Sequence, residues 1–249
     1  MTTVLKLGGS VVTEKDEPES VDEAALAGTA DAIVDAAVAD LVVVHGGGSF
    51  GHYHAANHGV STTEGTHDPE AVADVHGAMT QLNRRVVDAL LARSVPAVPV
   101  HPLSLCARDD AGALSFPFAS VETLLGEGFV PVLHGDLVAH AGAGTTVVSG
   151  DELVTSLARG LDADRVGMCS TVPGVLDEAG EVIPRIESFA DVESVLGGSA
   201  ATDVTGGMAA KVRSLLELGA PAFVFGPAEL ESFLVGRDVG TRVDGGETG

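Results

Sequence analysis

The chain has 249 residues, and its 13 Lys and Arg residues against 36 Asp and Glu give a formal net charge of −23. This length accommodates one large α/β domain or two small ones, and the 45% hydrophobic content excludes a disordered chain. The acidity argues against nucleic acid or an anionic membrane as a partner, because both attract basic surfaces. No apolar run reaches the roughly 18 residues of a membrane span, and the first 12 residues lack the pattern of a signal peptide. We therefore expect a cytoplasmic protein.

Strand and helix patterns alternate along the chain. Strands are expected at residues 3–7, 41–45, 97–100, 129–133, 165–170, 222–225 and 241–243, with a hairpin at 137–148. Helices are expected at residues 20–40, from 69 onward, and at 120–126, 151–161, 207–218 and from 227. Ser20 and Glu23 form a capping box for the first helix, and Asp68 caps the second. This alternation predicts a three-layer α/β/α sandwich with a mostly parallel central sheet, and we expect residues 1–249 to form a single domain.

Lysine is nearly absent from the sequence. Only Lys6, Lys15 and Lys211 occur among the 13 basic residues. An acidic surface so poor in lysine suggests adaptation to a high-salt cytosol, where the Debye length falls to about 3 Å and self-repulsion is screened. All three lysines lie in or beside glycine-rich segments, so each is a candidate for a function. Cys106 and Cys169 lie in apolar surroundings and are predicted to be buried thiols, since they form neither a disulfide framework nor a metal-ligand spacing.

The first strand runs into a candidate phosphate-binding turn. Lys6 places a cation at the end of the strand, and Gly8, Gly9 and Ser10 follow it. Glycines let backbone amides approach an anion closely. An ordinary turn between a strand and a loop explains the segment equally well, so both interpretations stay open.

The second strand is followed by a glycine-rich loop. Gly46, Gly48 and Gly51 formally match the dinucleotide-binding pattern, but a Rossmann unit also needs a helix that starts inside the loop and an acidic residue after the next strand. Residues 64–70 lead into a helix instead. We therefore expect the backbone amides of this loop to bind an anion rather than a dinucleotide. His52 ends the loop, where its imidazole could donate a hydrogen bond to that anion.

Three histidines follow one another at the end of this loop. His54 and His58 are spaced to share one face of a helix, and with His52 they could be interpreted as metal ligands. No cysteine or carboxylate stands beside them in a ligand pattern, so we expect no metal site.

Two further junctions join a loop to a helix. Gly150 and Asp151, after Ser149, place a carboxylate at a helix start, which a simple helix cap also explains. Residues 203–208, with Lys211 four residues after Gly207, form a second candidate anion site, although the Walker A sequence is absent. An α/β sheet gathers such loops at the carboxyl ends of its strands. Phosphoryl transfer requires such an arrangement, because it depends on charge neutralisation and alignment of the reactants.

Taken together, these motifs resemble the amino-acid kinase superfamily. The resemblance rests on Lys-x-Gly-Gly-Ser, the loop after the second strand, Ser-Gly-Asp, and Asp-Val-Thr-Gly-Gly-Met-x-x-Lys, in this order from residue 3 to about residue 243. Residues 45–52, with Thr13 and Lys15, are similar to the archaeal isopentenyl phosphate kinases in particular, and His52 discriminates most. The resemblance implies an amino-acid kinase fold with an N-terminal acceptor lobe and a C-terminal ATP lobe. It also implies transfer of the ATP γ-phosphate to isopentenyl phosphate, with Mg²⁺ present, in a homodimer.

The resemblance further implies a role for each candidate residue. Lys6 and Lys211 would bracket the β- and γ-phosphates of ATP, and Asp151 would orient their ammonium groups. Lys15 would stabilise the transferring phosphoryl group. The acceptor phosphate would lie against Gly47, His52 and Gly150. The other contacts to ATP would come from Gly8, Gly9, Ser10, Gly48, Thr171 and Gly207.

The hydrocarbon tail of the acceptor would need an apolar pocket. Val75 and Met79 on the long helix are candidates for its wall, although core packing explains each of them better.

The chain departs from the family at one motif. Residues 171–176 read Thr-Val-Pro-Gly-Val-Leu where the family usually has Asp-Val-Asp-Gly-Val-Tyr, so the contacts to the nucleoside end of ATP are left open. Two alternative functions also stay open. One is a kinase of the same fold for a phosphonate antibiotic, an amino-acid carboxylate or a nucleoside monophosphate. The other is a protein that binds or stores anions without catalysis, although three retained lysines and Asp151 favour an enzyme.

Overall fold

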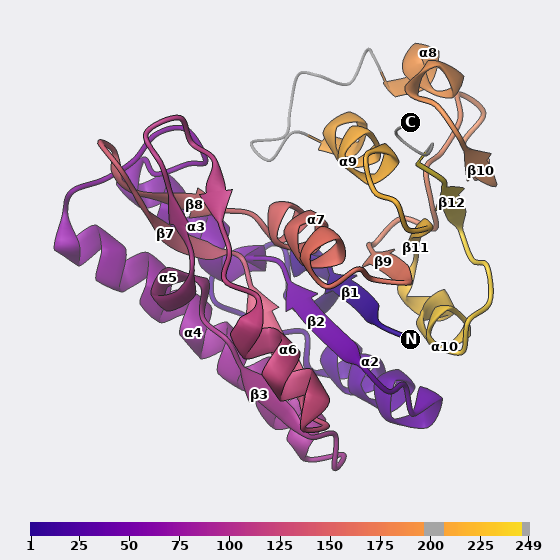
Figure 1. The fold of residues 1–249 in the computed structure, drawn as a ribbon, viewed down its shortest axis with the longest axis horizontal. Helices are drawn as coiled ribbons and strands as arrows, with labels where there is room; N and C mark the ends of the chain where they lie inside the picture. Colours follow the sequence, from indigo (N-terminus) through magenta and orange to yellow (C-terminus); the bar gives the residue numbers. More distant parts are fainter. Residues whose placement is uncertain (197–206, 246–249) are drawn as a thin grey trace.

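The computed structural model describes residues 1–196 and 207–245, and its centre is an eight-stranded sheet (Figure 1). The strands lie in the order β10-β12-β11-β9-β1-β2-β6-β3, and every neighbouring pair is parallel except β11 with β12. Their bounds are β1 Thr3–Leu7, β2 Leu41–His45, β3 Ala97–Pro99, β6 Val130–His134, β9 Arg165–Cys169, β10 Arg185–Ile186, β11 Ala222–Phe225 and β12 Thr241–Val243. The mostly parallel sheet predicted from the sequence is confirmed.

Helices cover both faces of this sheet, because neighbouring residues of a strand point to opposite sides. Val42 and Val44 pack in one core with α6, α7 and α9, whereas Leu41 and Val43 pack in another with α2, α4 and α10. The α-helices are α1 Gly9–Val12, α2 Glu23–Ala36, α3 Gly48–His58, α4 Pro69–Leu91, α5 Pro102–Leu105, α6 Ala119–Gly126, α7 Gly150–Gly160, α8 Glu193–Leu196, α9 Gly207–Leu216 and α10 Leu230–Leu234. The 3₁₀ helices are η1 Phe189–Asp191 and η2 Pro227–Glu229. In the described ranges, no helix has the length and apolar character needed to cross a membrane.

A second, four-stranded sheet lies beside the first, in the order β5-β4-β7-β8. It consists of β4 Ala107–Arg108, β5 Leu114–Ser115, β7 Asp136–His140 and β8 Gly144–Val148. The predicted hairpin is β7 with β8, whereas β4 and β5 are too short to show a periodic pattern. Arg108 ties this sheet to α7, because its guanidinium donates to both carboxylate oxygens of Glu152 at 2.6 Å. The small sheet is thereby held against the start of the helix that carries Asp151.

The first predicted helix is shorter than expected. Its N-cap is Asp22, whose side chain accepts a hydrogen bond from the Ala25 amide at 2.9 Å, so the predicted capping box at Ser20 is wrong. The helix ends at Ala36 because Ala37 adopts a left-handed conformation with φ of 47°. By contrast, Asp68 caps α4 as predicted.

The glycine loop after β2 is also shorter than predicted, because α3 begins inside it at Gly48. Gly48 has a φ of +49°, and a Cβ there would overlap the Thr13 hydroxyl, so only glycine fits. One requirement of a Rossmann unit is therefore met after all. The other is not met, since β3 is followed by Val100 and His101 rather than by an acidic residue.

Both cysteines are buried, as predicted. Burial raises the pKa of Cys106 and of Cys169 to about 12, so both side chains remain thiols at neutral pH.

Candidate active site

A cavity of about 400 Å³ opens where β1, β2 and β6 end. Its polar part is lined by the glycine loops after β1 and β2, by the step from β6 to β7 and by the start of α7. The polar-end residues that line it are Lys6, Gly9, Ser10, Gly46, Gly47, Gly48, His52, Gly135, Asp136, Ser149, Gly150 and Asp151. The parallel sheet thus gathers motifs that are far apart in the sequence, as the alternating pattern predicted.

Lys6 and Asp151 form an ion pair at one side of the cavity. Lys6 Nζ lies 2.6 Å from Asp151 Oδ1, and the two side chains are 12% and 26% exposed. Burial acts to raise the pKa of Asp151, but the charges of Lys6 and Lys211 and the hydrogen bond from Lys6 outweigh it and hold the pKa below its ordinary value. Asp151 is therefore ionised at neutral pH, and its negative charge is stabilised by the ammonium groups of Lys6 and Lys211.

The charge of Lys211 acts on Asp151 from α9. Helix α9 packs against α7 (Figure 1). Gly207 and Met208 begin the same helix. The preceding part of the predicted motif, residues 203–206, lies outside the described residues.

Three glycines surround a common space in the cavity. A methyl group added to Gly135 would lie 3.5 Å from the Gly150 nitrogen and 3.9 Å from the Gly47 nitrogen. One added to Gly150 would lie 3.2 Å from Lys6 Cε, and one added to Gly47 would lie 3.4 Å from His52 Cδ2. The Gly47 and Gly150 nitrogens, the Lys6 side chain and the His52 ring therefore surround a space without side chains, which the His45 and Val148 carbonyl oxygens also border. Such a set of donors suits a phosphate.

Gly135 belongs to this site although the sequence analysis did not select it. The signal was present, because β6 ends in His134 and is followed by Gly135, just as β2 ends in His45 and is followed by Gly46. Gly47, Gly150 and His52 were selected, and the structure brings them together as expected.

The first two glycine loops touch each other. A Cβ at Gly9 would overlap the backbone of Gly48, and a Cβ at Gly46 would lie 2.7 Å from the Gly9 nitrogen. Gly9, Ser10 and Gly48 line the cavity. Gly8 does not line it, and its amide donates to the Cys169 carbonyl at 2.8 Å, which fixes β1 to β9.

Lys15 and Thr171 lie outside the cavity on exposed segments. Lys15 is on the loop between Thr13 and Val21, and the Glu19 amide on this loop donates to the Ser49 carbonyl at the start of α3. Thr171 follows β9, the strand next to β1.

The three histidines of α3 point to different surroundings. His52 lines the cavity, whereas His54 Nε2 lies 3.0 Å from Glu19 and His58 Nε2 lies 3.0 Å from Asp74. Among residues 1–196 and 207–245, no three His, Cys, Asp or Glu side chains are grouped so that they could hold a metal ion.

The other end of the cavity is apolar. Its wall is formed mainly by Ala55, Ala56, Val60, Val75, Met79 and Val147, and the hydroxyl residues Ser61 and Thr62 line the cavity next to Val60. Val75 and Met79 are 2% and 1% exposed, so they belong to the core and also form the wall of the cavity. The cavity therefore joins a site for a phosphate to a space for a short hydrocarbon.

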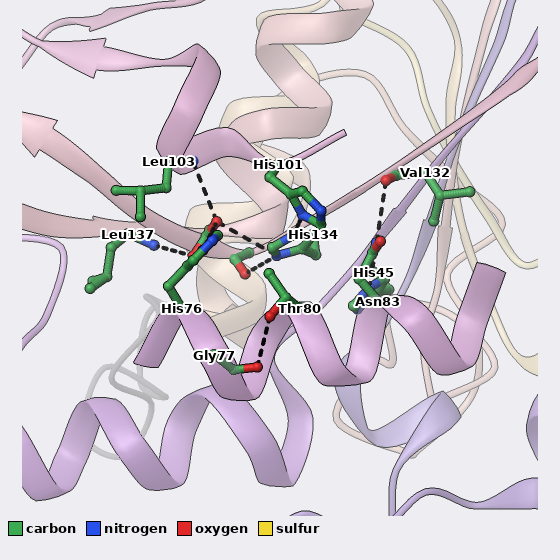
Figure 2. A network of polar contacts seen from close by, with 12 residues as sticks. His45, His76, Gly77, Thr80, Asn83, His101, Leu103, Val132, His134 and Leu137 are labelled. Atoms are coloured by element: carbon green, nitrogen blue, oxygen red, sulfur yellow. Dashed lines mark hydrogen bonds and ion pairs between the residues drawn. The ribbon is translucent and has the colours of Figure 1, made fainter. Parts of the chain in front are cut away.

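Asp136, which lines the polar end, belongs to a network of polar side chains (Figure 2). Both carboxylate oxygens of Asp136 accept from His76 Nδ1 at 3.0 Å, and the Leu103 and Leu137 amides donate to the same carboxylate. His101 Nδ1 lies 2.9 Å from His134 Nε2. The sequence analysis did not find this network, because its members come from three separate segments.

The chain resembles known kinases along nearly its full length. Residues 1–221 match the family model described as "Amino acid kinase family". The chain is 64% identical to isopentenyl phosphate kinase from Haloferax volcanii over 97% of this chain and 98% of the relative. It is 37% identical to the isopentenyl phosphate kinase from Methanothermobacter thermautotrophicus, with the same coverage.

More distant matches are also kinases and also extend over nearly the full chain. The acetylglutamate kinase from Aeromonas salmonicida is 31% identical over 97% of this chain and 98% of the relative. A solved structure described as "X-ray structures of isopentenyl phosphate kinase" matches with a TM-score of 0.82 and 30% identity, covering 98% of this chain and 100% of that chain. The chain belongs to the amino acid kinase family and, within it, to the isopentenyl phosphate kinases.

Proposed function

We propose that this protein transfers the γ-phosphate of ATP to isopentenyl phosphate and produces isopentenyl diphosphate for isoprenoid biosynthesis. The observation that carries the proposal is the cavity itself, in which the donors at Lys6, His52, Gly47 and Gly150 adjoin an apolar wall. An acceptor with a phosphate at one end and a short hydrocarbon at the other fits both halves. The relatives named isopentenyl phosphate kinase support the same substrate.

The apolar wall argues against the amino-acid acceptors of related kinases. An acetylglutamate acceptor carries carboxylates that would need charged or polar partners in the pocket. The wall beyond His52 consists instead mainly of Ala55, Ala56, Val60, Val75 and their neighbours, with neutral hydroxyls at Ser61 and Thr62 and no charged side chain. Burying a carboxylate there would cost more than burying a hydrocarbon.

The reaction follows from charge neutralisation and alignment. The acceptor is already a phosphate anion, so it needs no strong general base to attack the γ-phosphorus of ATP. Lys6 and Lys211 would stabilise the charge on the β- and γ-phosphates, and the ionised Asp151 between them would keep both ammonium groups in place. Lys15 would reach the transferring phosphoryl group from its exposed loop.

The remaining contacts to ATP would come from Gly9, Ser10, Gly48, Gly207 and Thr171. Gly8 would contribute mainly by shaping the turn, because its own amide is used by Cys169. The chain would act as a single domain, with the acceptor held by its N-terminal part and ATP by its C-terminal part.

Mg²⁺, a homodimer and a cytoplasmic location complete the proposal. In kinases Mg²⁺ is held largely by the substrate phosphates, so we infer that it enters together with ATP.

An ATP-consumption assay in molar KCl tests the proposal directly. The acceptors to compare are isopentenyl phosphate, dimethylallyl phosphate, carbamate, UMP, fosfomycin and N-acetylglutamate. We expect kcat/KM to be highest for a prenyl phosphate. A higher kcat/KM for UMP, fosfomycin or N-acetylglutamate would contradict the assignment.

We also expect activity and thermal stability to depend on molar salt. The chain carries 36 acidic and 13 basic residues, so its acidic surface repels itself when salt does not screen it. The melting temperature and kcat/KM should both fall when KCl is dialysed away and return when it is restored. Full activity with an unchanged melting temperature in dilute buffer would show that the acidic surface is not an adaptation to salt.

A further inference from the structure

A His-Gly dipeptide occurs twice at the polar end of the cavity, as His45-Gly46 and His134-Gly135, and we call each of them a His-Gly step. His45 ends β2 and His134 ends β6, and these two residues pair with each other in the parallel register. Both side chains are fully buried, and their rings stack with centroids 5.6 Å apart and an interplanar angle of 24°. The two His-Gly steps therefore stand side by side at the ends of the neighbouring strands β2 and β6.

Each histidine bonds to the carbonyl of the glycine that follows it. His45 Nδ1 lies 3.1 Å from the Gly46 oxygen, and His134 Nδ1 lies 2.9 Å from the Gly135 oxygen. A carbonyl oxygen can only accept, so Nδ1 carries the hydrogen in both rings. Burial lowers the pKa of His45 to about 4 and that of His134 to about 3, so both rings are neutral at physiological pH. Their Nε2 atoms are consequently acceptors.

Partners for both acceptors are in place (Figure 2). The Asn83 amide nitrogen lies 3.2 Å from His45 Nε2, and His101 Nδ1 lies 2.9 Å from His134 Nε2. Each ring is thus held in one tautomer and one orientation.

The hydrogen bonds to the glycine carbonyls determine where the next amide points. In a trans peptide the carbonyl oxygen and the amide hydrogen lie on opposite sides, and the described chain has no cis peptide bond. Because His45 draws the Gly46 oxygen toward the core, the Gly47 amide points away from it, toward the cavity that Gly47 lines. Within the described ranges, the Gly47 amide donates to no backbone carbonyl.

The second His-Gly step, His134-Gly135, borders the same site. His134 fixes Gly135, and a methyl group at Gly135 would stand 3.9 Å from the Gly47 nitrogen and 3.5 Å from the Gly150 nitrogen. The Gly135 amide in turn donates to the His45 carbonyl at 3.0 Å, which links the two steps.

We propose that His45 and His134 are positioning residues for the acceptor phosphate: His45 holds the Gly46 peptide so that the Gly47 amide points at the phosphate, and His134 holds Gly135 in place beside the Gly47 and Gly150 nitrogens. The histidines do not touch the substrate and act through these glycines. The proposal rests on the proposed function, because it concerns the phosphate of the same acceptor.

Pairs of variants at each histidine test this. The amide nitrogen of asparagine lies about where histidine carries Nδ1, and that of glutamine about where it carries Nε2. His45→Asn keeps the hydrogen bond to Gly46, whereas His45→Gln and His45→Leu lose it, and the same holds at His134. We expect the Gln and Leu variants to raise the KM for isopentenyl phosphate about tenfold, and the Asn variants by less than about threefold. The KM for ATP should stay unchanged in all of them.

A matched control separates positioning from stability. Thr146 is a fully buried residue of β8 that bonds to His140 and does not line the cavity. Thr146→Val should lower the melting temperature and leave both KM values as in the wild type.

The outcomes distinguish the two proposals. If the wild type does not phosphorylate isopentenyl phosphate, the proposed function itself fails. If the wild type is active but Asn and Gln variants have equal acceptor KM values, the histidines are structural only and the inference is overturned. The Asn and Gln variants are both polar, so this comparison remains decisive even where a Leu variant does not fold.

Discussion

Replacing Lys211 or Lys6 with alanine is expected to reduce kcat by about two to three decades while the fold survives. Both ammonium groups act on Asp151, and Lys6 Nζ contacts its carboxylate at 2.6 Å. In phosphoryl transfer the charge that develops on the transferred group must be neutralised locally, because a protein of net charge −23 offers no favourable overall field. Loss of one such cation should cost about 3–4 kcal/mol of transition-state stabilisation.

Steady-state kinetics with ATP and isopentenyl phosphate, together with melting temperatures, check this prediction. Arg213→Ala is the matched control for Lys211→Ala, because Arg213 lies on the same helix but stacks on the Phe189 ring. The control should keep its activity within about threefold of the wild type. A lysine variant that is equally active would refute the role assigned to that lysine.

The pH dependence of the ion pair follows from the direction of the pKa shift. The pKa of Asp151 is lower in the folded protein than its ordinary value of 3.8. A carboxylate with a depressed pKa stabilises the fold above its unfolded-state pKa, and this contribution is lost as the pH falls through the folded-state value. The Lys6–Asp151 pair therefore stays intact across neutral pH and weakens only in strong acid.

The sequence predicted the large sheet well, because its signal is local. Buried parallel strands read as continuous apolar runs, and β1 and β2 have the predicted bounds of residues 3–7 and 41–45. The long helix α4 was also predicted from its cap at Asp68 and its apolar stripe. Helix ends were less predictable. Ala37 ends α2 because it adopts a left-handed conformation, which an alanine in the sequence does not predict.

Contacts between residues far apart in the chain could not be predicted from the sequence. The convergence of Gly47, Gly135 and Gly150 depends on the order of β2 and β6 in the sheet, which no local pattern specifies. The same is true of the hydrogen bond between His76 and Asp136, which are 60 residues apart. The motifs nevertheless selected Lys6, Asp151 and His52, which the structure places at the cavity, because each stands in or beside a glycine-rich loop at the end of a strand or the start of a helix.

The last prediction concerns His52, which we propose selects the acceptor. His52 lies in the second turn of α3, and its ring is next to Gly47 at the cavity wall. If its imidazole donates to the non-transferred phosphate, His52→Ala should raise the KM for isopentenyl phosphate by about ten- to a hundredfold. Part of the loss should appear in kcat, because the attacking oxygen must also be aligned. The KM for ATP should change little, since we propose that the nucleotide is held by Lys6 and Lys211 instead.

The neighbouring histidine provides the control for this experiment. His54 is two residues away on the same helix, bonds to Glu19 at 3.0 Å and does not line the cavity. His54→Ala should therefore leave the acceptor KM unchanged, which separates the loss of a phosphate ligand from a general disturbance of α3. An unchanged acceptor KM and kcat in His52→Ala would remove His52 from the acceptor site. The acceptor phosphate would then have to be held by Lys6 and by the Gly47 and Gly150 amides, and the preference for isopentenyl phosphate would have to come from the apolar wall, because these donors would bind any phosphate.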